Sequence, residues 1–138
     1  MGFRSFIAIA VVALSLTAQI KDTFKARLSA VPADARTRAE LTGSGSASAV
    51  LEGSKLMITG SFEGLRTAAA TAQLHSAVAA GVRGPVIADL TVPKAISGMI
   101  TGSVDLTPPQ IANLRKGGLY IQIQTEKTPD GALWGWLL

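Results

Sequence analysis

Cysteine is absent from this chain of 138 residues, so disulfide bonds, thiolate metal ligands and thiol nucleophiles are excluded. Histidine occurs once, at His75, so the set of imidazole and thiolate ligands that usually closes a zinc or copper site is missing. Aromatic residues make up only 5% of the chain, which argues against a large ligand cavity lined by aromatic rings. We therefore expect an interior of small and aliphatic side chains that is stabilised by packing and hydrogen bonds alone.

Motifs of catalysis and of nucleotide binding are also missing. The chain has no Walker-type phosphate loop, no dinucleotide glycine fingerprint and no serine in a Gly-x-Ser-x-Gly elbow, which the string TGSGS resembles only superficially. Basic residues are scattered in runs no longer than two, so nucleic-acid binding is not expected. The formal net charge of +4 indicates a mildly basic, solvated surface, and a weak attraction to anionic envelope lipid or polysaccharide is the open alternative.

A membrane-spanning apolar run is missing as well. The uncharged apolar run over residues 5–18 is shorter than the roughly 20 residues that a transmembrane helix needs, and it lies between a basic residue and a polar stretch. This pattern predicts a signal peptide that forms a helix over residues 1–18 and is cleaved after Ala18 or after Ser15. A single mature domain over residues 19–138 is then expected outside the cytoplasm, periplasmic or secreted. Retention of the segment as an uncleaved anchor is the alternative.

The rest of the chain contains short segments in which apolar and polar residues alternate. Such alternation places successive side chains on opposite faces of a strand. The segment over residues 67–78 also fits a helix because it is rich in alanine, but a strand is favoured. Predicted strands cover residues 23–31, 46–51 and 55–62 (a hairpin turning at 52–54), 67–78, 86–90, 99–106, 119–125 and 132–138. Six to eight short strands of this kind predict an antiparallel sandwich or barrel.

One helix and two special backbone positions are also predicted. Over residues 107–118, Thr107 can cap a helix, Gln110 completes a capping box, and a glycine pair ends the segment. Gly60 interrupts the hairpin's second arm, which indicates either a β-bulge or a close approach of backbones. Residues 126–131 contain Pro-Asp-Gly and predict a turn between the last two strands.

Polar side chains at alternate positions form the candidate metal site. Gln73 and His75 are one such pair and Gln122 and Gln124 another, and each pair projects from one face of a strand about 7 Å apart. If the two strands are neighbours, the four side chains converge. A copper or zinc site of His75, Gln73 and Gln124 is therefore one hypothesis, but amides are poor ligands for these metals, so no metal, cofactor or catalytic residue is expected. The favoured alternative is that His75 hydrogen-bonds to a neighbouring strand or loop.

Two tryptophans form the candidate partner-binding site. Trp134 and Trp136 project from the same face of the last strand, and two indoles offer a large contact area at low entropic cost. Together with Gln122 and Gln124 they are the candidates for a contact with a partner. The structural alternative is that they close the core or form a cross-strand aromatic pair.

Four stretches follow one another along the chain: FKARLSAVP, LEGSKLMITGSFEGL, AQLHSAVAAGVRGPVIADL and LRKGGLYIQIQTEKTPDGALWGWL. In this order they resemble the CHRD domain, named after the extracellular protein chordin and also found in exported bacterial proteins. The resemblance runs from about Phe24 to Leu137. The family usually has two histidines where this chain has Gln73 and His75, and a further histidine where it has Gln124, so a polar or metal site built by those histidines is mostly lost here.

The resemblance implies an immunoglobulin-like β-sandwich or barrel, an extracytoplasmic location and no general catalytic activity. We therefore expect an all-β, antiparallel fold with one short helix after a signal helix. The expected function is that of an exported, non-enzymatic binding or structural module of the cell envelope or periplasm, which engages a protein partner or an envelope component. The alternatives are a metal-binding extracytoplasmic protein that uses His75 and an accessory subunit of a membrane or periplasmic complex.

Overall fold

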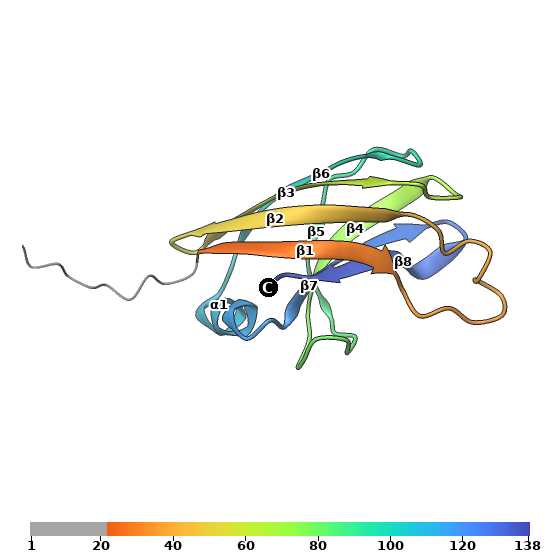
Figure 1. Ribbon diagram of the computed structural model, residues 1–138. Helices are drawn as coiled ribbons and strands as arrows, with labels where there is room; N and C mark the ends of the chain where they lie inside the picture. Colours follow the sequence, from red (N-terminus) through yellow and green to blue (C-terminus); the bar gives the residue numbers. More distant parts are fainter. Residues whose placement is uncertain (1–21) are drawn as a thin grey trace, which may run out of the picture.

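The computed structural model describes residues 22–138, which form eight β-strands and one α-helix (Figure 1). These are β1 (Thr23–Ala30), β2 (Ser44–Glu52), β3 (Lys55–Glu63), β4 (Ala69–Ser76), β5 (Val86–Leu90), β6 (Gly98–Asp105), α1 (Pro108–Arg115), β7 (Leu119–Thr125) and β8 (Thr128–Trp136). The signal helix predicted over residues 1–18 lies outside the described residues. Within residues 22–138, no helix has the length and apolar character needed to span a bilayer.

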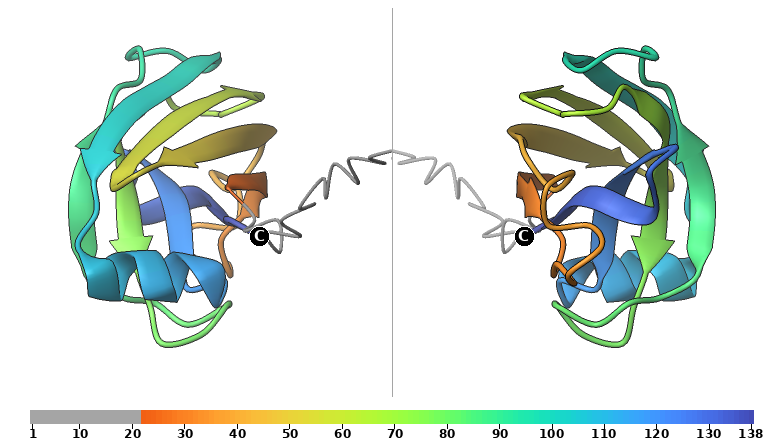
Figure 2. Two further views of the ribbon diagram at one scale, coloured as in Figure 1. Left: turned by 90° about the vertical axis from the view of Figure 1, so that its left-hand side faces the viewer. Right: turned by 90° about the vertical axis from the view of Figure 1, so that its right-hand side faces the viewer.

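All eight strands belong to one antiparallel sheet, in the order β5-β4-β7-β8-β1-β2-β3-β6. β1 joins the two halves of the sheet because it pairs with β2 over most of its length and with β8 at Ser29 and Ala30. A bridge between Thr91 and Thr101 brings the two edges together, so the sheet curls into a nearly closed barrel (Figure 2). The all-β antiparallel prediction is confirmed. The immunoglobulin-like sandwich is not confirmed, since pairing continues from one half to the other through β1.

Alternate residues of each strand fill the interior of the barrel, as the period-two patterns predict. On β7, for example, Leu119, Ile121 and Ile123 are buried in the core. Burial of each large aliphatic side chain contributes about 1.5–3 kcal/mol. Because the chain has no disulfide, this packed interior is the main source of its stability. The opposite face of the same strand is left for other contacts.

The predicted helix and its capping box are confirmed. The Thr107 Oγ1 atom accepts a hydrogen bond from the Gln110 backbone N–H, and the Gln110 Oε1 atom accepts one from the Thr107 N–H at 2.9 Å. Leu114 is the buried residue of α1. The side-chain amide of Asn113 donates to the Ser76 Oγ atom at 2.6 Å, so the helix is attached to the end of β4.

The hairpin of β2 and β3 shows that Gly60 marks a close approach and not a bulge. Pairing of the two strands is regular along the whole hairpin, including the Gly60 position opposite Ala47. A Cβ atom at Gly60 would lie 2.5 Å from the Ser46 carbonyl oxygen and 2.9 Å from Ala47. Glycine is therefore required there for the two strands to pair closely.

The turn predicted at Pro-Asp-Gly is wrong. The chain reverses at residues 126–127, and Pro129 lies within β8. The Thr125 and Thr128 hydroxyl groups hydrogen-bond to each other at 2.6 Å, and the Thr128 N–H donates to the Thr125 hydroxyl at 3.1 Å, which closes the tighter turn. Proline is tolerated here because the pairing of β7 with β8 is irregular between Ile123 and Thr125.

We predict that Gly60→Val destabilises the protein by about 1–3 kcal/mol, because the added side chain would overlap the β2 backbone. The sign of the change in the free energy of unfolding is informative, because valine at an unobstructed strand position would be more stable than glycine. Equilibrium unfolding in urea measures the change. A variant as stable as the wild type, or more stable, would contradict the close approach. The control is Gly53→Asn, because Gly53 has φ of 63° and a Cβ added there would meet no atom within 4 Å, and this change is expected to stay within about 0.5 kcal/mol.

Candidate functional site

The outer face of β4, β7 and β8 carries the side chains that the sequence singled out. Strand pairing places His75 opposite Tyr120, and Tyr120 opposite Trp136. One residue pair further along, Gln122 lies opposite both Gln73 on one side and Trp134 on the other. Two rows of side chains therefore cross three strands: His75, Tyr120 and Trp136 in one, and Gln73, Gln122 and Trp134 in the other.

Four rings form an aromatic cluster on this face, consisting of His75, Tyr120, Trp134 and Trp136. The His75 ring stacks on Tyr120, with centroids 4.7 Å apart and planes 14° apart. Trp136 lies 4.2 Å from Tyr120 and forms the predicted cross-strand pair with it, while Trp134 meets both rings edge-on at 5.9 Å. Tyr120 is fully buried, but both indoles are only partly buried and lie outside the core.

The backbone of Gly84 is held by two members of this cluster, in an arrangement that we call the Gly84 clamp. His75 Nδ1 lies 2.8 Å from the Gly84 carbonyl oxygen. Because a carbonyl oxygen can only accept, the geometry assigns the imidazole proton to Nδ1. The Tyr120 hydroxyl accepts from the Gly84 N–H at 3.1 Å and is 3.3 Å from the same carbonyl oxygen. The structural alternative for His75, a hydrogen bond to a neighbouring loop, is confirmed.

Arg83 extends from the clamped loop back across the aromatic cluster. Its Nη1 atom donates to Gln122 Oε1 at 3.2 Å and to the Asp130 carbonyl oxygen at 2.7 Å. Its guanidinium carbon lies 5.2 Å from the centroid of the Trp134 ring, within the range of a cation–π contact. Gln122 is only 2% exposed, so this candidate contact residue acts by positioning Arg83 and not by reaching the surface.

The remaining amides form a polar ladder across β7, β4 and β5. The Thr71 hydroxyl donates to Gln124 Oε1 at 2.6 Å, and Gln124 Nε2 donates to Gln73 Oε1 at 2.9 Å. Gln73 Nε2 then donates to Asp89 at 3.3 Å. The structure therefore brings Gln73 and Gln124 together, as the sequence predicted. Their side-chain amides hydrogen-bond to each other.

The three residues of the metal hypothesis are not joined by a common contact. His75 contacts Gly84 and Tyr120, whereas the two glutamines contact each other. The Nε2 atom of His75 is buried and has no hydrogen-bond partner in the described chain. Across residues 22–138, no cluster of three or more histidine, aspartate or glutamate side chains is arranged to hold a metal ion.

Two residues of the site were missed by the sequence interpretation. Tyr120 is the only tyrosine of the chain and alternates with the core residues of β7, a pattern that placed it on the outer face. Arg83 is the only charged residue among the small residues that connect β4 to β5. A lone cation in an apolar loop is a usable signal, but its partners lie 39 and 47 residues away in the sequence.

We predict that Tyr120→Phe keeps the ring contacts but leaves the Gly84 N–H without its partner, at a cost of about 1–2 kcal/mol. Amide hydrogen exchange at Gly84 should accelerate well beyond the change seen in the strands β2 and β3, which report global stability. An unchanged exchange rate at Gly84 relative to those strands would show that the hydroxyl does not hold the loop.

Comparison with known proteins identifies the family of the chain. The family model of the CHRD domain matches residues 24–137. Neither the curated proteins nor the solved structures contain a match to the chain. The matched range includes α1, all strands from the second residue of β1 onward, the aromatic cluster, the Gly84 clamp and the polar ladder. The chain therefore belongs to the CHRD domain family.

Proposed function

We propose that the chain is an extracytoplasmic, non-enzymatic binding module whose contact site is the indole pair, Trp134 and Trp136, with Arg83 beside it. Membership of the CHRD family supports a binding or structural module. The apolar run over residues 5–18 after a basic residue supports export. The observation that carries the proposal is that both indoles remain partly exposed on the outer face although the barrel core is already complete without them.

The composition and rigidity of this face fit a protein–protein contact. Tryptophan, tyrosine and arginine are the residues that most often dominate the binding energy of an interface. Here Tyr120 supports both indoles from below, and Arg83 is fixed by two hydrogen bonds while it covers one face of Trp134. Side chains that are already ordered lose little conformational entropy on binding, so the face is preorganised.

The polar ladder beside the indole pair supplies the rim that such a contact needs. Thr71 and Asp89 are exposed and Gln124 is partly exposed, so polar groups border the aromatic area on β4, β5 and β7. Interfaces commonly surround an aromatic centre with a solvated polar rim. We therefore favour a protein partner over an envelope polymer. An accessory subunit of a membrane or periplasmic complex would use the same contact.

The environment of His75 supports the non-enzymatic part of the proposal. The side chain is 7% exposed, its Nδ1 atom is engaged by Gly84, and its ring is stacked on Tyr120. A general base must come within hydrogen-bond reach of its substrate, and the nitrogen left for that role, Nε2, is buried. The metal-binding alternative has less support, since the two glutamines that would join His75 hydrogen-bond to each other.

The proposal is tested by co-purification from native envelope extracts with the double variant Trp134→Ala/Trp136→Ala. Loss of a hot-spot tryptophan costs at least about 2 kcal/mol, so the affinity for the partner should fall by roughly 30-fold and the recovery of the partner should fall with it. Far-ultraviolet circular dichroism should show the same β-sheet content as in the wild type, because the core lies on the other face of β8.

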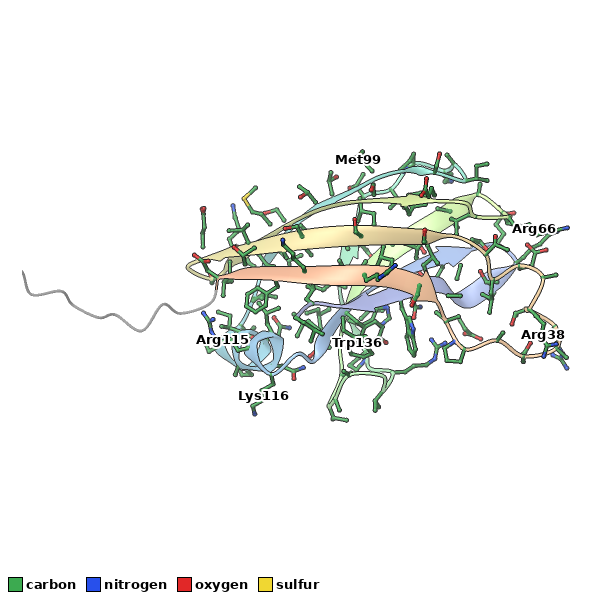
Figure 3. The ribbon with its side chains drawn as sticks, viewed as in Figure 1. Arg38, Arg66, Met99, Arg115, Lys116 and Trp136 are labelled. Carbon is green, nitrogen blue, oxygen red and sulfur yellow. The ribbon has the colours of Figure 1, made fainter. Side chains whose placement is uncertain are left out.

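The matched control is Met57→Ala/Met99→Ala, which removes two exposed apolar side chains from β3 and β6. Figure 3 shows Met99 at the upper edge of the view and Trp136 near its lower edge. This control should recover the partner at the level of the wild type. Equal recovery by the double tryptophan variant, or recovery of nothing but monomer by the wild type, would contradict the proposal.

A further inference from the structure

The loop between β4 and β5, residues 77–85, projects away from the barrel and past α1 (Figures 1 and 2). Its tip, residues 78–82, has the sequence VAAGV. The Val78 side chain is 91% exposed and Val82 is 44% exposed, and the three residues between them are exposed as well. Single apolar residues on a surface need no explanation, but a continuous exposed apolar run at the end of a projection is a candidate contact site.

The base of this loop is fixed to the body of the protein, so the exposure of the tip is imposed by the fold. The Gly84 clamp holds one arm of the loop. The other arm is held at Ala77, whose N–H donates to the Gly118 carbonyl oxygen at 2.8 Å and whose own carbonyl oxygen accepts from Asn113 at 2.8 Å. With both arms anchored, the two valines are kept away from the barrel core.

The loop, its flanks and the helix beside it carry positive charge and no acidic residue in their own sequence. Residues 76–88 and 107–118, which comprise the loop with its flanks and the helix beside it, contain no aspartate or glutamate. The same two segments contain Arg83, Arg115 and Lys116. Lys116 lies on the same side of the molecule as Trp136 and points in the direction in which the loop projects (Figure 3). The Asp130 carbonyl oxygen accepts a hydrogen bond from Arg83.

We propose that the loop tip docks on an anionic phospholipid surface, with Val78 and Val82 in the boundary between headgroups and acyl chains and Lys116 near the lipid phosphates. A convex apolar tip needs a matching pocket on a protein partner, whereas a lipid boundary takes it up without one. The basic flanks complement the negative surface potential of such a bilayer. Two valines and two alanines bury little area, so binding requires both contributions and is weakened by salt.

This contact is separate from the proposed partner contact, because it uses neither indole. It would nevertheless orient the molecule. Arg83 belongs to the loop and lies over Trp134, so a docked loop holds the indole pair close to the bilayer surface. A partner that is itself embedded in or attached to the membrane would then meet the indole pair without a search through bulk solvent.

Insertion of the tip is tested on the full chain with a site-specific fluorescent probe. The chain has no cysteine, so Ala80→Cys supplies a unique thiol for an environment-sensitive NBD label, and Met99→Cys supplies the control. With vesicles of about one third phosphatidylglycerol in phosphatidylcholine, the label at position 80 should shift to the blue and become protected from aqueous dithionite. The label at position 99 should do neither.

The contribution of the loop tip to the binding energy is tested by co-sedimentation of charge-matched variants with vesicles. Val78→Asp should lower binding at least about fivefold, while Met99→Asp, which adds the same charge far from the loop, should lower it less than about twofold. Lys116→Gln should lower binding and reduce its salt dependence. All variants share the same N-terminal segment, so differences between them report the loop.

Three results would each overturn the lipid proposal. Val78→Asp and Met99→Asp could lower vesicle binding equally, or the protein could bind vesicles of pure phosphatidylcholine as well as vesicles with phosphatidylglycerol. The third is a label at position 80 that stays exposed to dithionite. These outcomes leave the partner contact untouched, because co-purification depends on Trp134 and Trp136 and not on Val78. Conversely, lipid docking with normal insertion and no loss of partner in the tryptophan variant would refute only the partner contact.

Discussion

A single residue, Gly84, organises the outer face of this protein through its two backbone polar groups. Its carbonyl oxygen binds His75 and its N–H binds the Tyr120 hydroxyl, so two strands hold one loop. Only glycine fits there, because a Cβ atom would collide with the Ser76 carbonyl group. Arg83 precedes this glycine and is thereby directed over Trp134. The Gly84 clamp therefore fixes the positions of both the loop tip and Arg83, and through Arg83 it is connected to the indole pair.

The two faces of β7 make different kinds of contact. Leu119, Ile121 and Ile123 face the core, while Tyr120, Gln122 and Gln124 face outward into the aromatic cluster and the polar ladder. Substitutions on the outer face can therefore change the surface of the protein without changing the interior of the barrel. Gln73 and Gln124 illustrate this, because they hydrogen-bond to each other on the outer face and contribute nothing to the core.

Local signals predicted much of the fold and part of the site. Alternation identified the strands, and the capping box at Thr107 identified α1, since both depend on residues close together in the sequence. The turn after β7 was missed because Pro-Asp-Gly is the strongest local signal there, whereas the pairing of Thr125 with Thr128 decides where the chain reverses. Barrel closure was not distinguished from a sandwich, because it depends on β1 pairing with two different strands.

For the candidate site, the sequence predicted only which side chains share a face of the same strand. The shared faces of Gln73 with His75 and of Trp134 with Trp136 follow from strand geometry alone. Their partners do not, because the contacts of Gly84 with Tyr120 and of Arg83 with Asp130 join residues 36 and 47 positions apart. Such contacts are set by the strand order of the sheet, which one sequence does not specify.

The Gly84 clamp is tested most directly by the tautomer of His75 in the folded protein. Long-range ¹H–¹⁵N correlation spectra distinguish the two ring nitrogens, and His75 is the only histidine of the chain, so the signals need no further assignment. The clamp predicts a proton on Nδ1 that is slow to exchange, because it is donated to the Gly84 carbonyl oxygen. A ring protonated on Nε2, or an Nδ1 proton that exchanges freely with water, would contradict it.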